Sequence, residues 1–434
     1  MPAHALHPQQ DHDTTLRTLR ERFRQVRATS EALCAPLAIE DYGIQGMPDA
    51  SPPKWHLAHT TWFFEAFLLL PFLAGYRSPD SRYDALFNSY YLSHGQPFPR
   101  PRRGLLSRPT VAEVLNWRRV VNLALEELLD QPPAGTLDTL CRRLELGLHH
   151  EQQHQELLLM DLLYNFSLNP LAPAYRDDLP ALPTHTPAPL RWHHHPGGLV
   201  EIGHAGEGFA FDCERPRHRA WLEPFQLASR PVSNADYLSF LLDGGYSRSE
   251  LWLSDGWATL REQGWQAPLY WRHDEERGWL EFTLAGPRPL CLAAPACHLS
   301  FYEADAYARW AGARLPSEAE WECVAQSQPA HGHFLDSGLL RPQPAPAIPG
   351  AQPVQLFGDV WEWTASAFLP YPGFRPLDGS LGEYNGKFMC GQQVLRGGCC
   401  VTPPDHLRAS YRNFFYPHMR WAFSGLRLAR DESP

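Results

Sequence analysis

Four segments near the start of the chain place apolar side chains at helical spacing, with polar and charged residues between them. The second segment follows Pro52 and Pro53, and proline suits the first turn of a helix. Thr110 and Thr136 open the third and fourth segments as candidate N-caps. Because one long connection, 71–109, joins the second and third, the pattern predicts a four-helix bundle. The predicted helices are residues 16–37, 55–70, 110–129 and 137–166.

The pattern changes after the fourth segment. Residues 169–189 are rich in Pro and Ala, which is typical of a linker. Beyond them, residues 197–203 are strand-like, and short apolar runs alternate with Trp, Gly and Pro. Only 234–242 and 302–311 carry helical spacing, so we expect an irregular α+β domain. The predicted division is a helical bundle at 1–168, a linker at 169–189 and an α+β domain at 190–434.

Composition narrows the function classes. The 434 residues carry a formal net charge of −10, which argues against a nucleic-acid partner or an anionic membrane surface. The sequence contains no apolar run of about 18 residues that would span a membrane. Residues 1–15 lack the apolar stretch of a secretion signal, and the nine cysteines form no CxxC pair. We therefore expect a cytoplasmic protein with reduced thiols.

The motif HEQQH at 150–154 is the sharpest chemical signal. His150 and His154 are four residues apart in the longest helical segment, so both imidazoles share one helix face and can reach one ion. Imidazole binds Fe, Zn, Cu and Ni, and bundle metal sites are built from such inward-facing side chains. The alternative is a solvent-facing histidine pair, because this spacing is common by chance.

A third ligand is needed to favour the metal. His59 lies in the apolar second helix, where a buried histidine needs a polar partner. His56 is the second candidate on the same helix. The alternative for either residue is a hydrogen-bonded core histidine.

These motifs and several others resemble one family. The first half carries SPPKWHLAHTTWFFE at 51–65, FNSYY at 87–91 and HEQQH at 150–154. The second half carries RPVSNADY at 230–237, RLPSEAEWE at 314–322, GDVWEW at 358–363, RGG at 396–398 and SGLR at 424–427. Together they resemble the ergothioneine-type sulfoxide synthases, including their close relatives that make selenoneine. The resemblance covers nearly the whole chain.

The resemblance implies a fold and an activity. The fold is an N-terminal DinB-like four-helix bundle joined to a C-terminal formylglycine-generating-enzyme-like domain, a variant of the C-type lectin architecture. The family implies Fe(II) on His59, His150 and His154, with O₂ as co-substrate. The implied reaction joins hercynine to a thiol or selenosugar donor, giving a sulfoxide or a selenoneine precursor. No nucleic-acid or membrane partner is expected.

The resemblance also implies substrate-binding residues. Hercynine carries a quaternary ammonium group, which favours aromatic and polar surroundings. The matching positions are Gln153 beside the metal ligands, and Asn413, Phe414 and Phe415 near the C-terminus. Without the resemblance, core packing would be the favoured interpretation of Phe414 and Phe415.

Tyr90 and Tyr91 match a tyrosine pair that supplies a proton in one subclass of the family. One of the two could serve only in packing, and the sequence does not select between them. Arg100, Arg103 and, elsewhere, Arg420 are candidates for holding the carboxylate of the donor, because arginine binds carboxylates in a bidentate manner. The alternative for the arginines is a solvated run of charges.

Two positions depart from the family pattern. Asp359 stands where Asn is common, and Cys399 stands where Ser is common. The cysteine makes the selenoneine branch a live hypothesis, and a buried packing role is the alternative. Two other function classes compete: a zinc-dependent DinB-like thiol transferase and a non-catalytic lectin-like binding protein. The first gives no reason for the second domain, and the second gives none for the three histidines.

Overall fold

The computed structural model describes residues 8–183, 185–206, 208–346 and 352–432. The chain divides into two compact units, Met1–Asn165 and Phe166–Pro434, and each is described by itself. In the described residues, none of the helices has both the length and the apolar character needed to cross a membrane.

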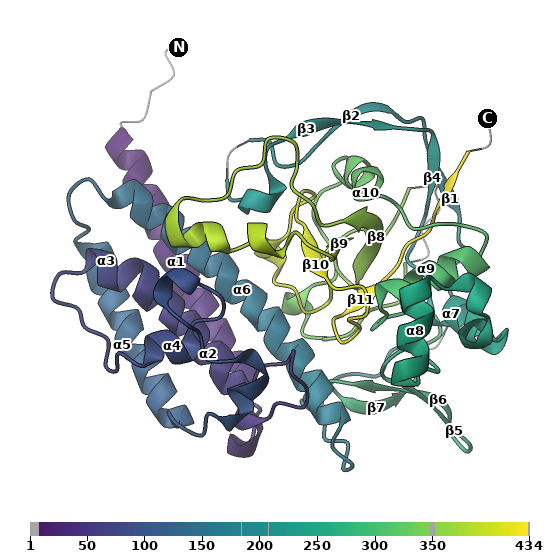
Figure 1. Cartoon of the computed structure of the whole chain (residues 1–434), viewed down its shortest axis with the longest axis horizontal. Helices are drawn as coiled ribbons and strands as arrows, with labels where there is room; N and C mark the ends of the chain where they lie inside the picture. The colour runs from purple at the N-terminus through teal and green to yellow at the C-terminus, as the bar shows by residue number, and fades with distance from the viewer. Residues whose placement is uncertain (1–7, 184, 207, 347–351, 433–434) are drawn as a thin grey trace. The chain divides into compact units, whose positions relative to one another are not determined.

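The first unit is built on the four predicted long helices (Figure 1). The first helix begins earlier than the sequence predicts. The second ends earlier as an α-helix, because it continues as a π-helical turn. The other boundaries agree with the prediction to within a few residues. The helix bounds are α1 Pro8–Cys34, α2 Pro53–Phe64, α5 Val111–Asp130 and α6 Leu137–Ser167.

Helix α2 is buried along its whole length. Pro52 is its N-cap and Pro53 its first residue, where the missing N–H would in any case lack a partner inside the helix. The helix continues through a π-helical turn, η2 (Glu65–Leu69), into the short α3 (Leu70–Phe72). Its polar residues, Lys54, His56 and His59 among them, are buried as well, so they need partners inside the unit.

The connection between the second and third long helices contains short elements that the sequence analysis did not predict. They are α4 (Tyr83–Phe87), η3 (Leu92–His94) and η4 (Arg100–Leu105). Helix α5 then opens with a capping box, in which the Glu113 N–H donates to Thr110 Oγ1 at 3.2 Å and the Thr110 N–H donates to Glu113 Oε2 at 2.7 Å. The predicted N-cap at Thr110 is confirmed.

A buried carboxylate ties α6 to its neighbours. Glu151 is fully buried and accepts hydrogen bonds from Arg27 Nη1 on α1 at 2.9 Å and from Arg118 Nη2 on α5. Ser30 Oγ donates to the same carboxylate at 2.6 Å. Burial alone would raise the pKa of Glu151, but the Arg118 and Arg27 guanidinium groups hold it at about 2. The carboxylate therefore stays ionised and fixes three helices in register.

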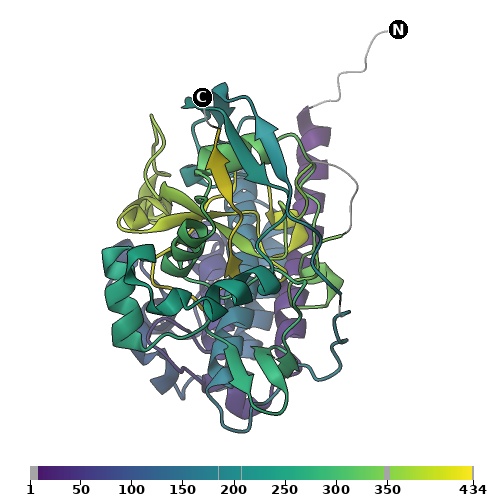
Figure 2. The ribbon, with the colours of Figure 1, turned by 90° about the vertical axis from the view of Figure 1, so that its right-hand side faces the viewer.

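The second unit combines short strands with short helices, as Figure 2 shows from a second direction. One sheet has the order β1 (Trp192–His195), β4 (Phe225–Ala228), β12 (Ala429–Asp431). Another has the order β10 (Asn413–Phe415), β9 (Gln393–Arg396), β8 (Trp361–Ala367), β11 (Ser424–Gly425). The remaining strands pair as β2 (Gly198–Ile202) with β3 (His218–Leu222), and as β5 (Trp271–Asp274), β6 (Gly278–Thr283), β7 (Gly286–Pro289).

Four helices complete this unit. Two match the predicted stretches and two were missed. They are α7 (Asn234–Leu242), α8 (Ser254–Gln263), α9 (Phe301–Trp310) and α10 (Glu318–Ala325). The missed α10 begins with a capping box, Ser317 with Glu320, that is readable in the sequence. Its eight residues are too few to establish a period by themselves.

Residues of three C-terminal motifs meet at one buried ion pair. Glu362, from GDVWEW, accepts from Arg427 of SGLR at 2.7 Å, and both side chains are fully buried. Trp321, from RLPSEAEWE, donates its indole N–H to Glu362 Oε2 at 2.7 Å. These three motifs therefore contact one another in the interior of the second unit.

The Pro/Ala-rich segment 169–189 contains no helix or strand among its described residues. It is not detached from the second unit: Tyr175 and Leu179 are buried, and the Arg176 N–H donates to the Leu284 carbonyl at 3.0 Å.

We predict that Glu151→Gln lowers the free energy of unfolding of the bundle by about 3–5 kcal/mol at pH 7, because buried Arg27 loses its carboxylate partner and buried Arg118 keeps only the exposed Glu31. The native pKa of Glu151 lies at about 2, below that of an unfolded glutamate. Its contribution should therefore be constant above about pH 4.5 and decline as the pH falls toward 2. Hydrogen exchange of α6 amides in the metal-free protein, read by mass spectrometry, measures both effects.

Glu145→Gln is the matched control on the same helix. Its ion pair with Arg22 is 3.7 Å long and partly exposed, so its loss should cost at most about 1 kcal/mol. An equal effect of the two substitutions would contradict the role given to Glu151.

Candidate metal centre

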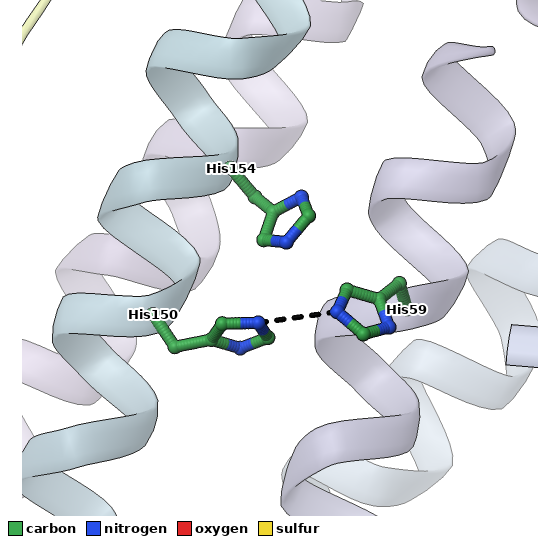
Figure 3. Close-up of side chains that lie close together, drawn as sticks. All are labelled: His59, His150 and His154. Carbon is green, nitrogen blue, oxygen red and sulfur yellow. Dashed lines mark hydrogen bonds between the residues drawn. The ribbon is translucent and has the colours of Figure 1, made fainter. Parts of the chain in front are cut away.

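Three histidines meet inside the bundle. His150 and His154 project from one face of α6, and His59 faces them from α2 (Figure 3). One ligand atom from each histidine lies within 4.8 Å of the other two. His59 Nε2 and His150 Nε2 are 3.1 Å apart. The structure thus brings together the three residues that the sequence selected.

All three imidazoles are held in the neutral form. Burial is the main cause and lowers the pKa of His59, His154 and His150, the last to about 3. The histidines also repel one another's charge, which lowers the pKa of His59 and His154 further. A neutral imidazole has a free lone pair on one nitrogen, which is the form that binds a metal ion.

The spacing fits a transition metal. Two imidazole nitrogens bound at 2.0–2.1 Å are about 2.8–3.0 Å apart at adjacent octahedral positions and about 3.3–3.4 Å apart in tetrahedral geometry. The 3.1 Å between His59 and His150 lies between these two values. Three neutral nitrogen ligands suit Fe(II) as well as Zn(II), and they leave coordination positions open for other molecules.

His59 is fixed in orientation. Its Nδ1–H donates to the Phe87 carbonyl at 2.6 Å, so its Nε2 lone pair points toward the other two histidines. Its ring stacks on two tryptophans. The ring centroids are 4.5 Å apart with an interplanar angle of 12° for Trp55, and 5.6 Å apart with an angle of 15° for Trp62. Phe63 packs against His150, with ring centroids 4.5 Å apart. The site is therefore lined with aromatic rings on the α2 side.

The tyrosine pair lies in the same unit. The Tyr91 ring is fully buried, 5.6 Å from Trp62, and the Asn88 side chain clamps the Tyr91 backbone through two hydrogen bonds. Tyr90 is half-buried, with its ring 4.7 Å from that of Tyr91. One aromatic side chain, Trp62, therefore lies between the Tyr91 ring and His59, and Tyr90 contacts the far partner of this series, Tyr91.

The predicted arginines differ from one another. Arg100 is exposed and donates to the Asp49 carbonyl. Arg103 is 3% exposed and lies 3.3 Å above the Trp55 ring. It donates to Ser51 Oγ at 2.8 Å and Ser89 Oγ at 3.2 Å.

Arg103 is a buried cation with only neutral hydrogen-bond partners. Within the described ranges, no carboxylate lies at ion-pair distance from it, and burial lowers the pKa of its guanidinium. It lines a small pocket together with Lys54 and Trp55, and Lys54 is also buried. The Asp161 carboxylate acts on Arg103 only from a distance, and a buried cation that forms no ion pair favours binding of an anion.

The remaining candidates fall in different places. Gln153 is half-buried on α6, next to His154. Asn413, Phe414 and Phe415 form strand β10 of the second unit and are half-buried. Phe414 stacks on Phe368 at 4.0 Å, as the packing alternative expects.

Arg420 already has a counter-charge. It is buried in the second unit, 3.3 Å from Glu303, and lies over the Trp265 ring. These contacts give Arg420 a structural role in that unit.

Sequence reasoning missed one residue beside the centre. His56, the second ligand candidate, lies next to His154 and contacts Asp161, which the sequence analysis did not single out. The signal was available, because Asp161 follows His154 by seven residues and so shares its helix face.

Comparison with known proteins accounts for both units. The DinB superfamily matches residues 22–158, and the sulfatase-modifying factor enzyme 1-like domain matches 194–344 and 353–432. The hercynine oxygenase of Mycolicibacterium thermoresistibile is 33% identical over 413 residues and covers 88% of each chain. That of Mycolicibacterium smegmatis is 34% identical over 429 residues, covering 88% of this chain and 92% of its own. Ergothioneine biosynthesis protein 1 of Schizosaccharomyces pombe is 28% identical over 236 residues, covering 51% of this chain and 28% of its own.

The fold is therefore a DinB-like helical bundle followed by a sheet-containing sulfatase-modifying-factor domain. The chain belongs to the hercynine oxygenase family, the ergothioneine-type sulfoxide synthases, and thus to a family of oxidoreductases. Both the fold class and the family resemblance predicted from the motifs are confirmed.

We predict that His150→Ala reduces bound Fe(II) from about one ion per chain to nearly none after anaerobic reconstitution, because two nitrogens cannot replace the three-histidine set. Elemental analysis after desalting measures this. His149→Gln is the control, since His149 is the adjacent histidine but faces Arg22 at 3.5 Å. Retention of one iron per chain by His150→Ala would refute the ligand assignment.

Proposed function

We propose that this protein is a cytoplasmic, Fe(II)- and O₂-dependent enzyme that joins hercynine to a thiol or selenol donor. The observation that supports this most strongly is the convergence of His59, His150 and His154 inside a bundle whose relatives are named hercynine oxygenases. When bound, iron would supply a Lewis-acidic, redox-active centre with positions open to the donor and O₂.

The reaction balances without a further reductant. The C2–H bond of hercynine and the S–H or Se–H bond of the donor break, and the C–S or C–Se bond forms. One oxygen atom of O₂ goes to the chalcogen and the other leaves as water. The products are a sulfoxide in ergothioneine biosynthesis, or the corresponding precursor in selenoneine biosynthesis.

The tyrosine pair is our candidate for proton transfer. A phenol stays protonated at neutral pH and can donate to a developing anion. Tyr91 is positioned by Asn88 and packs on Trp62, beside the ligand His59. Tyr90 is the more exposed of the two. Both remain assigned to this step.

Arg103 is our first candidate for the residue that binds the acidic group of the donor. Its guanidinium is buried, lacks a carboxylate partner among the described residues, and stacks on Trp55, which in turn stacks on His59. An anion held there would be one aromatic ring away from the metal ligands. Arg100 and Arg420 are weaker candidates, because one is exposed and the other is paired with Glu303.

For hercynine we propose Gln153 and the β10 residues Asn413, Phe414 and Phe415. Gln153 is adjacent in sequence to a metal ligand. The two phenylalanines offer aromatic surfaces suited to a quaternary ammonium group, and all four side chains are only half-buried.

Two other function classes are less well supported. A zinc-dependent thiol transferase would need only the bundle, but the family match extends over both units. A non-catalytic lectin-like protein would need only the second unit and would leave the buried histidine cluster without a purpose.

Mass spectrometry of reaction mixtures tests the proposal. The iron-loaded protein is mixed anaerobically with hercynine and with cysteine, γ-glutamylcysteine or a selenosugar in turn, and is then exposed to ¹⁸O₂. We expect a product whose mass is hercynine plus donor plus one ¹⁸O minus two hydrogens, with one O₂ consumed per product. A selenium isotope pattern confined to the selenosugar would assign the selenoneine branch. Absence of product and of O₂ uptake with every donor would refute the proposal.

We predict that Arg103→Met raises the KM for the donor by about 10- to 100-fold, the usual cost of losing hydrogen bonds to a charged group, while the KM for hercynine changes little. Steady-state kinetics with each substrate varied in turn measures the difference. Arg102→Met, one residue away but exposed, is the control. Equal increases in both KM values would contradict a donor-specific role.

A further inference from the structure

A buried chain of polar groups runs behind His154. One nitrogen of its ring faces His59 and His150, and the other points away from them (Figure 3). His154 Nδ1 lies 2.8 Å from His56 Nδ1, and His56 Nε2 lies 3.2 Å from Asp161 Oδ2. The Ser51 backbone N–H donates to the same carboxylate oxygen at 2.7 Å.

The chain is made by the two helices that carry the metal ligands. His56 lies one turn before His59 on α2, and Asp161 lies two turns after His154 on α6. His56 and Asp161 are each 3% exposed, so bulk water does not compete for their hydrogen bonds. The proposed chemistry uses neither residue.

One arrangement of the protons gives each contact in this chain a donor and an acceptor. In this arrangement His56 donates from Nε2 to the carboxylate of Asp161. A neutral imidazole has one donor and one acceptor, which leaves His56 Nδ1 as an acceptor. His154 then donates from Nδ1, and its Nε2 lone pair faces His59 and His150.

We propose that His56 and Asp161 are positioning residues that select the metal-binding tautomer of His154. The Phe87 carbonyl does the same for His59 through its Nδ1–H. The two histidines therefore have the same tautomer, with the proton on Nδ1. A backbone carbonyl selects it for His59, and a histidine–carboxylate pair selects it for His154. This inference rests on the proposed function only in taking His154 as a ligand.

The function of the pair resembles that of a carboxylate behind a catalytic histidine. There, the carboxylate orients the ring and fixes its tautomer, and its loss leaves the geometry intact but the proton on the wrong nitrogen. At metal sites, loss of such a partner typically weakens metal binding 10- to 100-fold. We expect a loss of this size when the acceptor behind His154 is removed.

The first test needs no metal. ¹⁵N-labelled histidine in the metal-free protein reports which ring nitrogen carries the proton, with His154→Gln and His56→Asn spectra used for assignment. We expect His154 to be protonated at Nδ1 and His56 at Nε2. A proton on His154 Nε2 would overturn the proposal. Because this readout is independent of iron, failure of the proposed function would show separately, as failure of the unaltered protein to bind Fe(II).

The second test compares two substitutions of His56. His56→Leu introduces an apolar side chain of similar size and so removes the acceptor for the His154 Nδ1–H. His56→Asn places an amide oxygen near the position of Nδ1 and can still accept from His154. Fe(II) affinity is measured anaerobically by competition with a chelator, with circular dichroism as the check on folding.

We expect His56→Leu to bind Fe(II) 10- to 100-fold more weakly than the unaltered protein, and His56→Asn to remain within about threefold of it. A purely structural role would weaken both variants equally or neither, and either result would overturn the proposal. If His56→Leu does not fold, the tautomer measurement on the unaltered protein decides the question alone.

Discussion

The arrangement of the first unit depends on the two buried ion pairs that Glu151 forms. Its carboxylate lies between Arg27 and Arg118 and so fixes α6 against α1 and α5. The preceding residue is the candidate ligand His150, which points instead toward His59 on α2. Because adjacent helix positions project in different directions, two neighbouring residues contribute to the packing of the helices and to the histidine cluster. A rotation of α6 that moved the carboxylate from its guanidinium partners would also move the imidazole from the site.

The environment of the histidines reconciles two conflicting requirements. Burial keeps the imidazoles neutral and therefore able to bind a metal, but buried polar groups must have partners. The Phe87 carbonyl satisfies His59 Nδ1, and the His56 ring satisfies His154 Nδ1. Each partner takes one ring nitrogen and leaves the other facing the neighbouring histidines. The nitrogens of His59 and His150 that face each other lie 3.1 Å apart, an arrangement that suits a cation.

The sequence predicts what depends on neighbouring positions and misses what depends on tertiary contacts. The long helices follow from apolar periodicity, and His150 with His154 follows from a spacing of one turn. A histidine in an apolar helix requires a partner, which makes His59 and His56 candidates, and the family resemblance points to His59. By contrast, the Asp161 contact to His56 joins residues 105 positions apart, and the Arg27 contact to Glu151 joins residues 124 apart. No local pattern encodes such pairs, and short elements such as α10 have too few residues to show a period.

The two departures from the family pattern prove to be interior positions. Asp359 adopts a left-handed backbone conformation with φ 58, and its carboxylate accepts from the Gln343 N–H at 2.8 Å and from Gln355 Nε2 at 2.9 Å. Burial raises the pKa of Asp359 to about 7. Cys399 is fully buried, with its sulfur 3.3 Å from Thr402 Oγ1. Both side chains make these contacts inside the second unit. Discrimination between donors is better sought at groups that can contact them, and Arg103, a buried cation whose contacts are all with neutral side chains, is the first of these.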